Sequence, residues 1–239
     1  ARMSPSTSPS TWISPDVLRL PLTCKSADSV DHFIANSHFV AERIKRIYQR
    51  DATVIHPPVD TDYYSEGQYD KQDYYLYVGQ LIPYKRPDLA IAACKRMNRK
   101  LIIVGDGDMR AELEIMAVGA NVHFAGRPDN AGLKKYYAEA RALLFPGVED
   151  FGIVPLEAQA AGTPVIALGK GGALETVVKD QTGLFFDEVD VKSLTKAIEK
   201  FEALKFDVGL LKQHAAKFNS ERFRDEISSF IRLKLKKDG

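Results

Sequence analysis

The stretch Glu149-Asp150-Phe151-Gly152-Ile153-Val154-Pro155-Leu156-Glu157 joins an apolar run to a run of small residues. The apolar run, Ala142-Leu143-Leu144-Phe145-Pro146, is typical of a buried strand, and Ala158-Gln159-Ala160-Ala161-Gly162 is typical of a helix. Pro155 suits the first position of that helix, because its missing N–H would have no partner there. We therefore expect Glu157 in the first turn and Glu149 in the preceding loop, at the edge of an α/β sheet where ligands bind.

Two interpretations of this stretch stay open on its spacing alone. In the first, Gly152 lets a ligand approach the backbone, and free N–H groups near Ile153 and Val154 attract phosphate or hydroxyl oxygens. In the second, Glu157 only complements the helix dipole, and Glu149 belongs to a solvated turn. The surrounding chain is needed to choose between them.

Strand and helix signals alternate on both sides of this stretch. Strands are predicted at 74–78, 100–104, 121–125, 142–145, 164–168 and 183–186, and helices are predicted to begin near Pro87, Asp108, Asp129, Pro155, Ala173 and Asp190. Such alternation predicts an α/β fold, a Rossmann-like doubly wound parallel sheet with helices on both faces.

The chain divides into four predicted parts. Residues 1–29 begin rich in Ser, Pro and Thr and are expected to form a low-complexity tail or linker. Residues 30–66 hold a short strand, a helix over His38 to Tyr48 and a second strand at 53–55, and a polar, Tyr-rich linker spans 60–73. With a boundary near Gly67, the sheet domain covers 67–217, and 218–239 form a last helix.

Composition limits the classes of function. The 239 residues include 33 Lys and Arg against 32 Asp and Glu, a near-neutral balance that argues against a nucleic-acid partner. Cys24 and Cys94 imply no disulfide framework, and Cys94, in an apolar helical run, is expected to be a buried free thiol. Neither a signal peptide nor a membrane span is recognisable, so a cytoplasmic protein is expected.

Other strand ends also carry glycine and charge. Gly79-Gln80-Leu81-Ile82-Pro83-Tyr84-Lys85-Arg86-Pro87 leads from the first strand of the sheet into a helix, so its loop should open on the same edge as Glu149. A lysine there could neutralise a diphosphate, although an exposed basic loop is an alternative. Gly105-Asp106-Gly107-Asp108 lacks the third glycine of a dinucleotide fingerprint, and a tight turn with Asp108 as helix cap fits better.

The sequence shows little evidence of a metal site or of a catalytic nucleophile. The five histidines, His32, His38, His56, His123 and His214, show no ligand spacing in the sequence. Asp60-Thr61-Asp62 has the Asp-x-Asp form that another class of sugar transferases uses for a divalent cation. It does not end a long buried strand, so we predict no metal site.

Several ordered motifs together resemble the C-terminal, donor-binding half of retaining glycosyltransferases of family four, which have the two-domain GT-B fold. These motifs are the phosphate loop that starts at Val78, the Glu-x7-Glu stretch from Glu149 to Glu157, Ile55-His56-Pro57-Pro58-Val59-Asp60 at the connection between domains, and Gly171-Gly172-Ala173-Leu174-Glu175-Thr176-Val177-Val178. The resemblance implies that residues 30–66 are a remnant of the N-terminal GT-B domain and that 218–239 form the helix that crosses back to it.

The resemblance also implies an activity and a site. It implies transfer of a hexose, with mannose from GDP-mannose as the candidate, from a nucleotide diphosphate sugar to a saccharide or lipid-linked acceptor, without metal or other cofactor. Glu149 and Lys85 would be catalytic: Glu149 would contact the donor sugar, and Lys85 would hold the leaving diphosphate. Substrate would also be bound by Gly79, Gln80, Arg86, Arg127, Gly152, Ile153, Val154 and Glu157, with Glu157 on the ribose and Arg127 at the nucleobase.

This chain departs from the family pattern in two ways. Gln80 stands where the family usually has an arginine, so Arg86 or Arg127 would have to supply the missing charge. Only about sixty residues precede the linker, too few for an acceptor-binding domain. We therefore keep an alternative function, a non-catalytic nucleotide-sugar-binding subunit that needs a separate N-terminal-domain chain. The apolar face of the last helix makes a homodimer a second candidate assembly, and a peripheral position at the inner face of the membrane is the alternative location.

Overall fold

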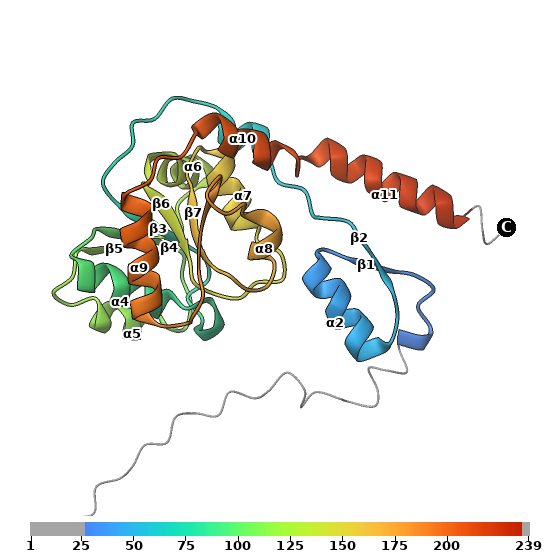
Figure 1. Ribbon diagram of the computed structural model, residues 1–239, viewed down its shortest axis with the longest axis horizontal. Coiled ribbons are helices and arrows are strands. Elements are labelled where there is room, and N and C mark those ends of the chain that lie inside the picture. The colour runs from blue at the N-terminus through green and yellow to red at the C-terminus, as the bar shows by residue number, and fades with distance from the viewer. Residues whose placement is uncertain (1–26, 236–239) are drawn as a thin grey trace, which may run out of the picture.

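The computed structural model describes residues 27–235. The predictions for residues 1–26, Cys24 among them, and for residues 236–239 lie outside the described residues. Two bodies are visible in Figure 1: a large one built on a six-stranded sheet, and a smaller one that contains β1, α2 and β2.

The large body has the predicted parallel sheet, with strand order β5-β4-β3-β6-β7-β8. Its strands are β3 (Tyr75–Val78), β4 (Leu101–Val104), β5 (Val122–Gly126), β6 (Ala142–Phe145), β7 (Val165–Leu168) and β8 (Gly183–Phe186). Each begins and ends within one residue of its predicted bounds. From β3 the chain builds outward to β5 and then returns to place β6 on the other side of β3, which is the doubly wound order. The predicted fold class is confirmed.

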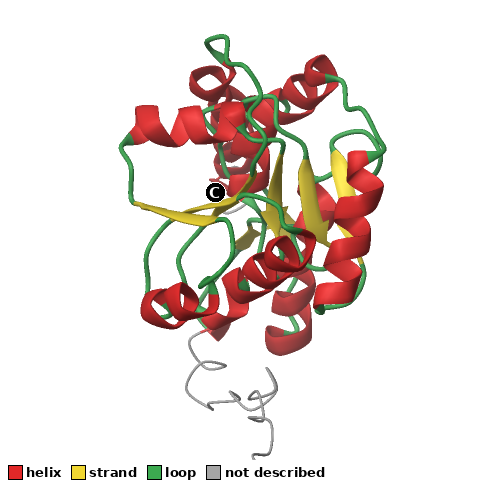
Figure 2. Cartoon of the chain, turned by 90° about the vertical axis from the view of Figure 1, so that its left-hand side faces the viewer, coloured by secondary structure: helices red, strands yellow, loops and turns green. Residues whose placement is uncertain are grey.

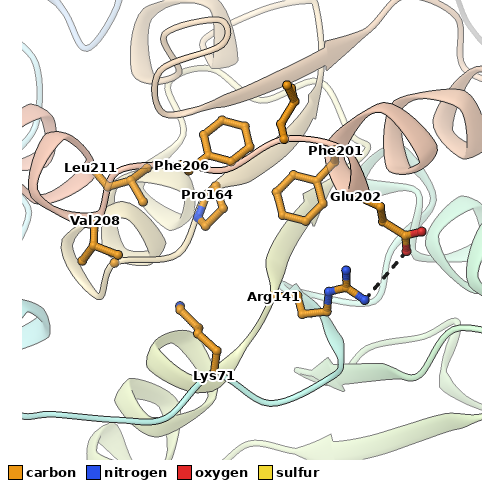
Figure 3. A pocket seen from close by; sticks show the side chains of 10 residues that line it. Lys71, Arg141, Pro164, Phe201, Glu202, Phe206, Val208 and Leu211 are labelled. Atoms are coloured by element: carbon orange, nitrogen blue, oxygen red, sulfur yellow. Dashed lines mark ion pairs between the residues drawn. The ribbon is translucent and has the colours of Figure 1, made fainter.

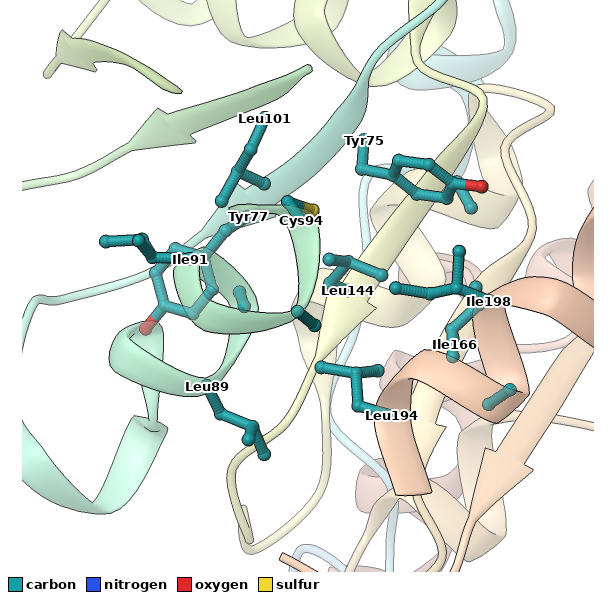
Figure 4. Packing of buried hydrophobic residues seen from close by; sticks show 14 of the residues in the cluster. Tyr75, Tyr77, Leu89, Ile91, Cys94, Leu101, Leu144, Ile166, Leu194 and Ile198 are labelled. Carbon is teal, nitrogen blue, oxygen red and sulfur yellow. The ribbon is translucent and has the colours of Figure 1, made fainter. Parts of the chain in front are cut away.

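Alternate side chains of each strand pack into two separate cores, because successive residues of a strand point to opposite faces. On one face, Tyr75, Tyr77 and Leu144 pack with α4 (Pro87–Met97), α5 (Arg110–Met116) and α9 (Val191–Glu202); Figure 4 shows this core. On the other face, Leu76 and Leu143 pack with α6 (Asn130–Glu139), α7 (Ile153–Ala160) and α10 (Val208–Ala216). Figure 2 shows helices on both sides of the strands.

Local sequence signals set several helix starts. Pro87 is at the start of α4. Asp129 caps α6 by accepting a hydrogen bond from the N–H of Gly132, and Asp190 caps α9 by accepting one from the N–H of Ser193. These are the partners expected of helix-capping carboxylates.

Two predicted helix starts were wrong. Helix α7 begins at Ile153 and not at Pro155, because Gly152 adopts a φ of 111° and serves as its N-cap. Glu157 is therefore the fifth residue of the helix, outside its first turn. Helix α5 begins at Arg110, and Met109, not Asp108, is its N-cap.

The smaller body is a parallel pair, β1 (Phe33–Ala35) and β2 (Ala52–Val54), joined by α2 (His38–Tyr48). The segment predicted as a linker instead contains α3 (Thr61–Ser65), whose Tyr64 is buried and packs edge-on against Tyr137 of the large body. Buried aromatic contacts of this kind tie the segment to the sheet domain.

The helix predicted over 218–239 is preceded by a separate helix, α10. Helix α10 packs on α7, and after a break α11 (Ser220–Leu235) extends away from the sheet in Figure 1. None of the residues of α11 is buried. A groove of about 450 Å³ separates α11 from β2, with Ile55, Phe230 and Leu233 among its lining residues.

Two short helices and the cysteine complete the described part of the chain. They are η2 (Pro83–Lys85), a single turn of 3-10 helix after β3, and α8 (Ala173–Thr176). Cys94 is a buried free thiol, as predicted, and burial raises its pKa to about 12. Within residues 27–235, no helix combines the length and the apolarity needed to cross a bilayer.

Candidate functional site

The loops after β3 and β6 meet at the point where the strand order reverses. These two strands are hydrogen-bonded neighbours, but their following connections lead to opposite sides of the sheet, which opens a crevice at their carboxyl ends. The two loops are in close contact: a Cβ on Gly147 would lie only 2.7 Å from the Cα of Lys85. The fold therefore places the loop that carries Lys85 beside the loop that carries Glu149.

Lys85 and Glu149 form an ion pair across this crevice. The Nζ of Lys85 is 2.7 Å from Oε1 of Glu149, and each side chain is 22% exposed. Lys85 is the last residue of η2, and Glu149 lies in the loop before α7. Because an ammonium group has three donors, Lys85 can hold this carboxylate and still donate to a bound anion.

Helix α7 begins directly after the loop that carries Glu149. Gly152 precedes the helix at positive φ, and a Cβ there would lie 3.0 Å from the hydroxyl of Thr176. Ile153 and Val154 are the first two helical residues, and the N–H groups at such positions have no partner within the helix. Together with the helix dipole, they favour an anionic group next to Glu149.

A cavity of about 310 Å³ opens beside Lys85's loop. It is formed by the ends of β3, β4 and β5, and it is lined by Val78, Gly79, Gln80, Val104, Gly105, Asp106, Arg127, Pro128 and Leu133. Three of these, Gly79, Gln80 and Arg127, were predicted site residues, so the structure brings them together. Sequence reasoning did not single out Leu133, because it comes from the helix α6 and not from a strand end.

Arg86 is not among the residues that line that cavity. Its Nη2 lies 2.8 Å from Oδ2 of Asp88, and its Nε also donates to the same carboxylate, which raises the pKa of the guanidinium. The guanidinium of Arg86 is therefore already paired with Asp88. It was one of the two groups expected to supply the positive charge that is missing at Gln80. Arg127, which does line the cavity, is the better placed of the two candidates.

Glu157 is not among the residues that line the cavity. Its Oε2 accepts a hydrogen bond of 2.8 Å from the hydroxyl of Tyr137, which is fully buried, and Tyr64 also hydrogen-bonds to the carboxylate. Burial raises the pKa of Glu157, although the bonds from the two tyrosines act against this shift. The two tyrosines were missed because they come from α6 and α3, far from Glu157 in sequence.

Asp60 of the Asp-x-Asp sequence has a local role. Its side chain accepts a hydrogen bond from the N–H of Tyr63 and caps α3, and Thr61 is buried. This cap accounts for the position of Asp60 without a metal ion.

A second cavity, of about 280 Å³, lies at the other end of the strands, away from their carboxyl ends (Figure 3). Arg141 and Pro164 line it and directly precede β6 and β7, so it opens at the amino ends of the strands. Lys71 donates to the hydroxyl of Thr163 over 2.5 Å, and burial and the nearby Lys212 lower its pKa to about 8. Sheets of this kind bind ligands at the other edge, so the crevice at Lys85 is the better candidate.

Comparison with known proteins identifies a family for most of the described chain. The family model described as glycosyl transferases group 1 matches residues 60–221, more than half of the chain and all of the loops described above.

Two curated relatives illustrate the range of similarity. The chain is similar to the uncharacterized glycosyltransferase MJ1607 of Methanocaldococcus jannaschii, with 36% identity over 57% of this chain and 37% of that protein. It is also similar to the D-inositol 3-phosphate glycosyltransferase of Mycobacteroides abscessus, with 29% identity over 84% of this chain and 52% of that protein. The chain thus spans about half the length of the curated relatives that it matches, or less.

Solved structures share the fold at low identity. Anabaena Alr3699/HepE in complex with UDP superposes with a TM-score of 0.78 and 19% identity, over 92% of this chain and 69% of that one. Sucrose-phosphate synthase from Thermosynechococcus elongatus gives a TM-score of 0.75 and 23% identity, over 91% of this chain and 61% of that one. At these identities the similarity establishes the architecture alone.

Proposed function

Because the chain belongs to the group 1 glycosyl transferases, we propose that it is the donor-binding portion of a retaining hexosyltransferase. Its donor would be a nucleotide diphosphate sugar, with GDP-mannose as the first candidate, and its acceptor a hydroxyl of a saccharide or a lipid-linked glycan. Transfer would serve polysaccharide or glycolipid assembly on the cytoplasmic side of a membrane.

The Lys85–Glu149 pair is the observation that carries this proposal. It lies at the reversal point of a doubly wound sheet, between two loops whose backbones touch. In the proposed reaction, the lysine stabilises the diphosphate as it leaves, and the carboxylate stabilises positive charge that develops on the sugar. Because the two groups are close together, they can act on the two sides of the breaking bond, the carboxylate on the sugar and the lysine on the phosphate.

The N-terminus of α7 would assist the same leaving group. The N–H groups of Ile153 and Val154 supply donors without any side-chain rearrangement, so they are ready when negative charge builds on the phosphate. In this scheme the departing phosphate takes the proton of the acceptor hydroxyl, and no separate general base is needed.

The cavity at Gly79, Gln80 and Arg127 would receive the nucleoside. It is continuous with the loop that carries Lys85, and its lining combines apolar strand ends with the amide of Gln80 and the guanidinium of Arg127. Such a mixture of apolar walls and a few polar groups is typical of small-molecule sites. Glu157 would bind the ribose hydroxyls, since a carboxylate has about four lone-pair positions and two tyrosines need only two of them.

Titration calorimetry with GDP, UDP, ADP and their sugar conjugates, without added metal, tests the donor site. We expect Lys85→Ala to weaken binding of the preferred diphosphate by ten- to about a hundredfold, the usual value of a charged hydrogen bond. Lys200→Ala is a matched control, because Lys200 also forms a lysine–carboxylate pair, with Asp180 at 3.0 Å, but before the amino end of β8 and not in the loops that form the crevice.

Two results would contradict the proposal. One is equal binding by wild type, Lys85→Ala and Lys200→Ala, which would remove Lys85 from the site. The other is tight binding without any preference between diphosphates and nucleosides. Should the chain bind a donor and yet transfer sugar only when an acceptor-domain chain is added, the alternative of a binding subunit would hold.

A further inference from the structure

Two histidines that are scattered in the sequence come together with a glutamate in the structure. His38 is the first residue of α2, His56 follows β2, and Glu175 lies in α8 of the large body. One possible ligand atom from each of them lies within 4.8 Å of the other two. Their separation in the chain, up to 137 residues between His38 and Glu175, explains why the sequence showed no ligand spacing.

The distance between His56 and Glu175 already fits a shared ion. Nε2 of His56 is 3.0 Å from Oε2 of Glu175. Two ligand atoms bonded to one zinc ion at about 2.0–2.1 Å are roughly 2.9 Å apart at a right angle and roughly 3.3 Å apart at a tetrahedral angle. An ion can therefore replace the proton between these two atoms with only a small displacement of either side chain.

Both of these groups are held in place by their surroundings. The ring of His56 stacks on Phe151, with 5.1 Å between centroids, and leans on Phe218. The carboxylate of Glu175 accepts hydrogen bonds from the backbone N–H groups of His38, at 2.9 Å, and Phe39, at 3.1 Å. Metal sites are tighter when their ligands are oriented in advance by such contacts.

His38 is the residue that a structural role alone does not explain. Glu175 caps α2 through the backbone N–H of His38 and hydrogen-bonds directly to the imidazole of His56, and neither contact needs the imidazole of His38. That imidazole is exposed, and it lies edge-on to His56 with 6.1 Å between ring centroids. One of its ring nitrogens already lies within 4.8 Å of the ligand atoms of His56 and Glu175.

We propose that His38, His56 and Glu175 bind a divalent transition-metal ion of the zinc class, which ties α2 and the segment after β2 to α8. Two imidazoles and one carboxylate favour Zn²⁺, Co²⁺ or Ni²⁺ over Mg²⁺ and Ca²⁺, which prefer oxygen ligands. Because His38 is exposed, solvent can supply a fourth ligand. The role is structural and independent of the sugar-transfer chemistry proposed for Lys85 and Glu149.

Co²⁺ and Zn²⁺ titrations of protein without a histidine tag test this site. We expect one equivalent of Co²⁺ to produce a visible absorption band that Zn²⁺ removes, and Zn²⁺ to raise the unfolding temperature by binding the folded state. His38→Ala and His56→Ala should each weaken Zn²⁺ binding by more than about tenfold, at least the loss typical of a supporting residue. His123→Ala, a change at an exposed histidine of β5, should leave binding unchanged.

The choice of His38→Ala keeps the test independent of folding. This variant retains the backbone N–H that bonds to Glu175, so its unfolding temperature without metal should equal that of the wild type. Three results would overturn the proposal: unchanged Zn²⁺ affinity in His38→Ala and His56→Ala, equal binding of Mg²⁺ and Zn²⁺, or no binding by the wild type up to about 1 mM Zn²⁺.

Discussion

Glu157 is held in an environment that disfavours its charge. Burial raises the pKa of its carboxyl group above the ordinary value of 4.5, and the hydrogen bonds from Tyr137 and Tyr64 only partly offset this effect. The folded state therefore binds a proton more readily than the unfolded state does. By linkage, stability contributed at this residue is greatest when the group is protonated and is lost as the pH rises through its folded pKa.

We expect Glu157→Gln to increase the free energy of unfolding at pH 7, because glutamine can accept from Tyr137 without a buried charge. The gain should shrink as the pH falls toward and below 4.5, where the carboxyl group of the wild type is neutral as well. Urea unfolding of both proteins across this pH range measures the difference. The same substitution should weaken nucleotide binding if Glu157 binds the ribose.

Glu199→Gln is the control for this prediction, since Glu199 is exposed on α9. A similar gain in both variants would mean that a general charge effect, and not the burial of Glu157, is responsible.

At the scale of elements, several glycines act by letting backbones touch each other. A Cβ on Gly105 would lie 1.9 Å from the carbonyl oxygen of Gly79, and one on Gly172 would lie 2.2 Å from the Cα of Phe151. Through these contacts the loop after β3 packs against the loop after β4. The loop before α8 packs in the same way against the loop that carries Glu149. The site depends on this packing, since it fixes where Lys85 and Glu149 meet.

Gly105→Ala should therefore damage both stability and the site. Gly105 has a φ of 133°, and the added methyl group would overlap Gly79, so we expect a loss above about 2 kcal/mol in the free energy of unfolding. Diphosphate binding at the neighbouring loop should fall as well. Denaturant unfolding and calorimetry measure the two effects.

Gly119→Ala separates the backbone effect from the overlap. Gly119 also has positive φ, 77°, but a Cβ there would meet nothing within 4 Å. It should cost about 1 kcal/mol and leave ligand binding unchanged. Equal losses in the two variants would show that the contact with Gly79 is not important.

At the scale of the whole molecule, polar contacts dock the smaller body on the large one. Arg43 of α2 donates two hydrogen bonds, of 2.9 and 2.8 Å, to Asp150, the neighbour of Glu149. The carboxylate of Glu175 accepts hydrogen bonds from the first two N–H groups of α2. Burial alone would raise the pKa of Glu175, but the bonds from His38, His56 and Phe39 outweigh it and lower the pKa below 4.5.

We expect Glu175→Gln to speed hydrogen exchange in α2 at pH 7, measured without metal, while the amides of β3 and β6 stay protected. A lowered pKa means that the charged group stabilises the docked state above pH 4.5, and that this contribution is lost as the pH falls through the folded pKa. The difference between variant and wild type should therefore disappear at acidic pH.

Glu42→Gln makes the same charge change at an exposed position of α2. It should leave exchange unaltered, and faster exchange there would point to the net charge of the helix and not to docking. Arg43→Ala alone should cost less than about 1 kcal/mol, because its pair with Asp150 is largely exposed.

The strand bounds and many helix starts could be predicted because their causes are local. Apolar runs such as 142–145 and caps such as Asp190 act on residues within a few positions, so the sequence contains the whole interaction. The wrong helix starts at Pro155 and Asp108 have a related explanation. The backbone of Gly152 and of Met109 is set by contacts with other loops, and local preferences do not describe those contacts.

The sequence by itself determined the doubly wound α/β architecture, since alternating strands and helices leave few ways to bury both faces of a parallel sheet. Only the tertiary structure decided which side chains meet: Lys85 with Glu149, Glu157 with Tyr137, and His38 with His56 and Glu175. These partners are separated by long stretches of chain, and their distances depend on the order of the strands and the packing of whole helices. Local preferences contain no information about such distances, so the site's chemistry emerges only in the folded molecule.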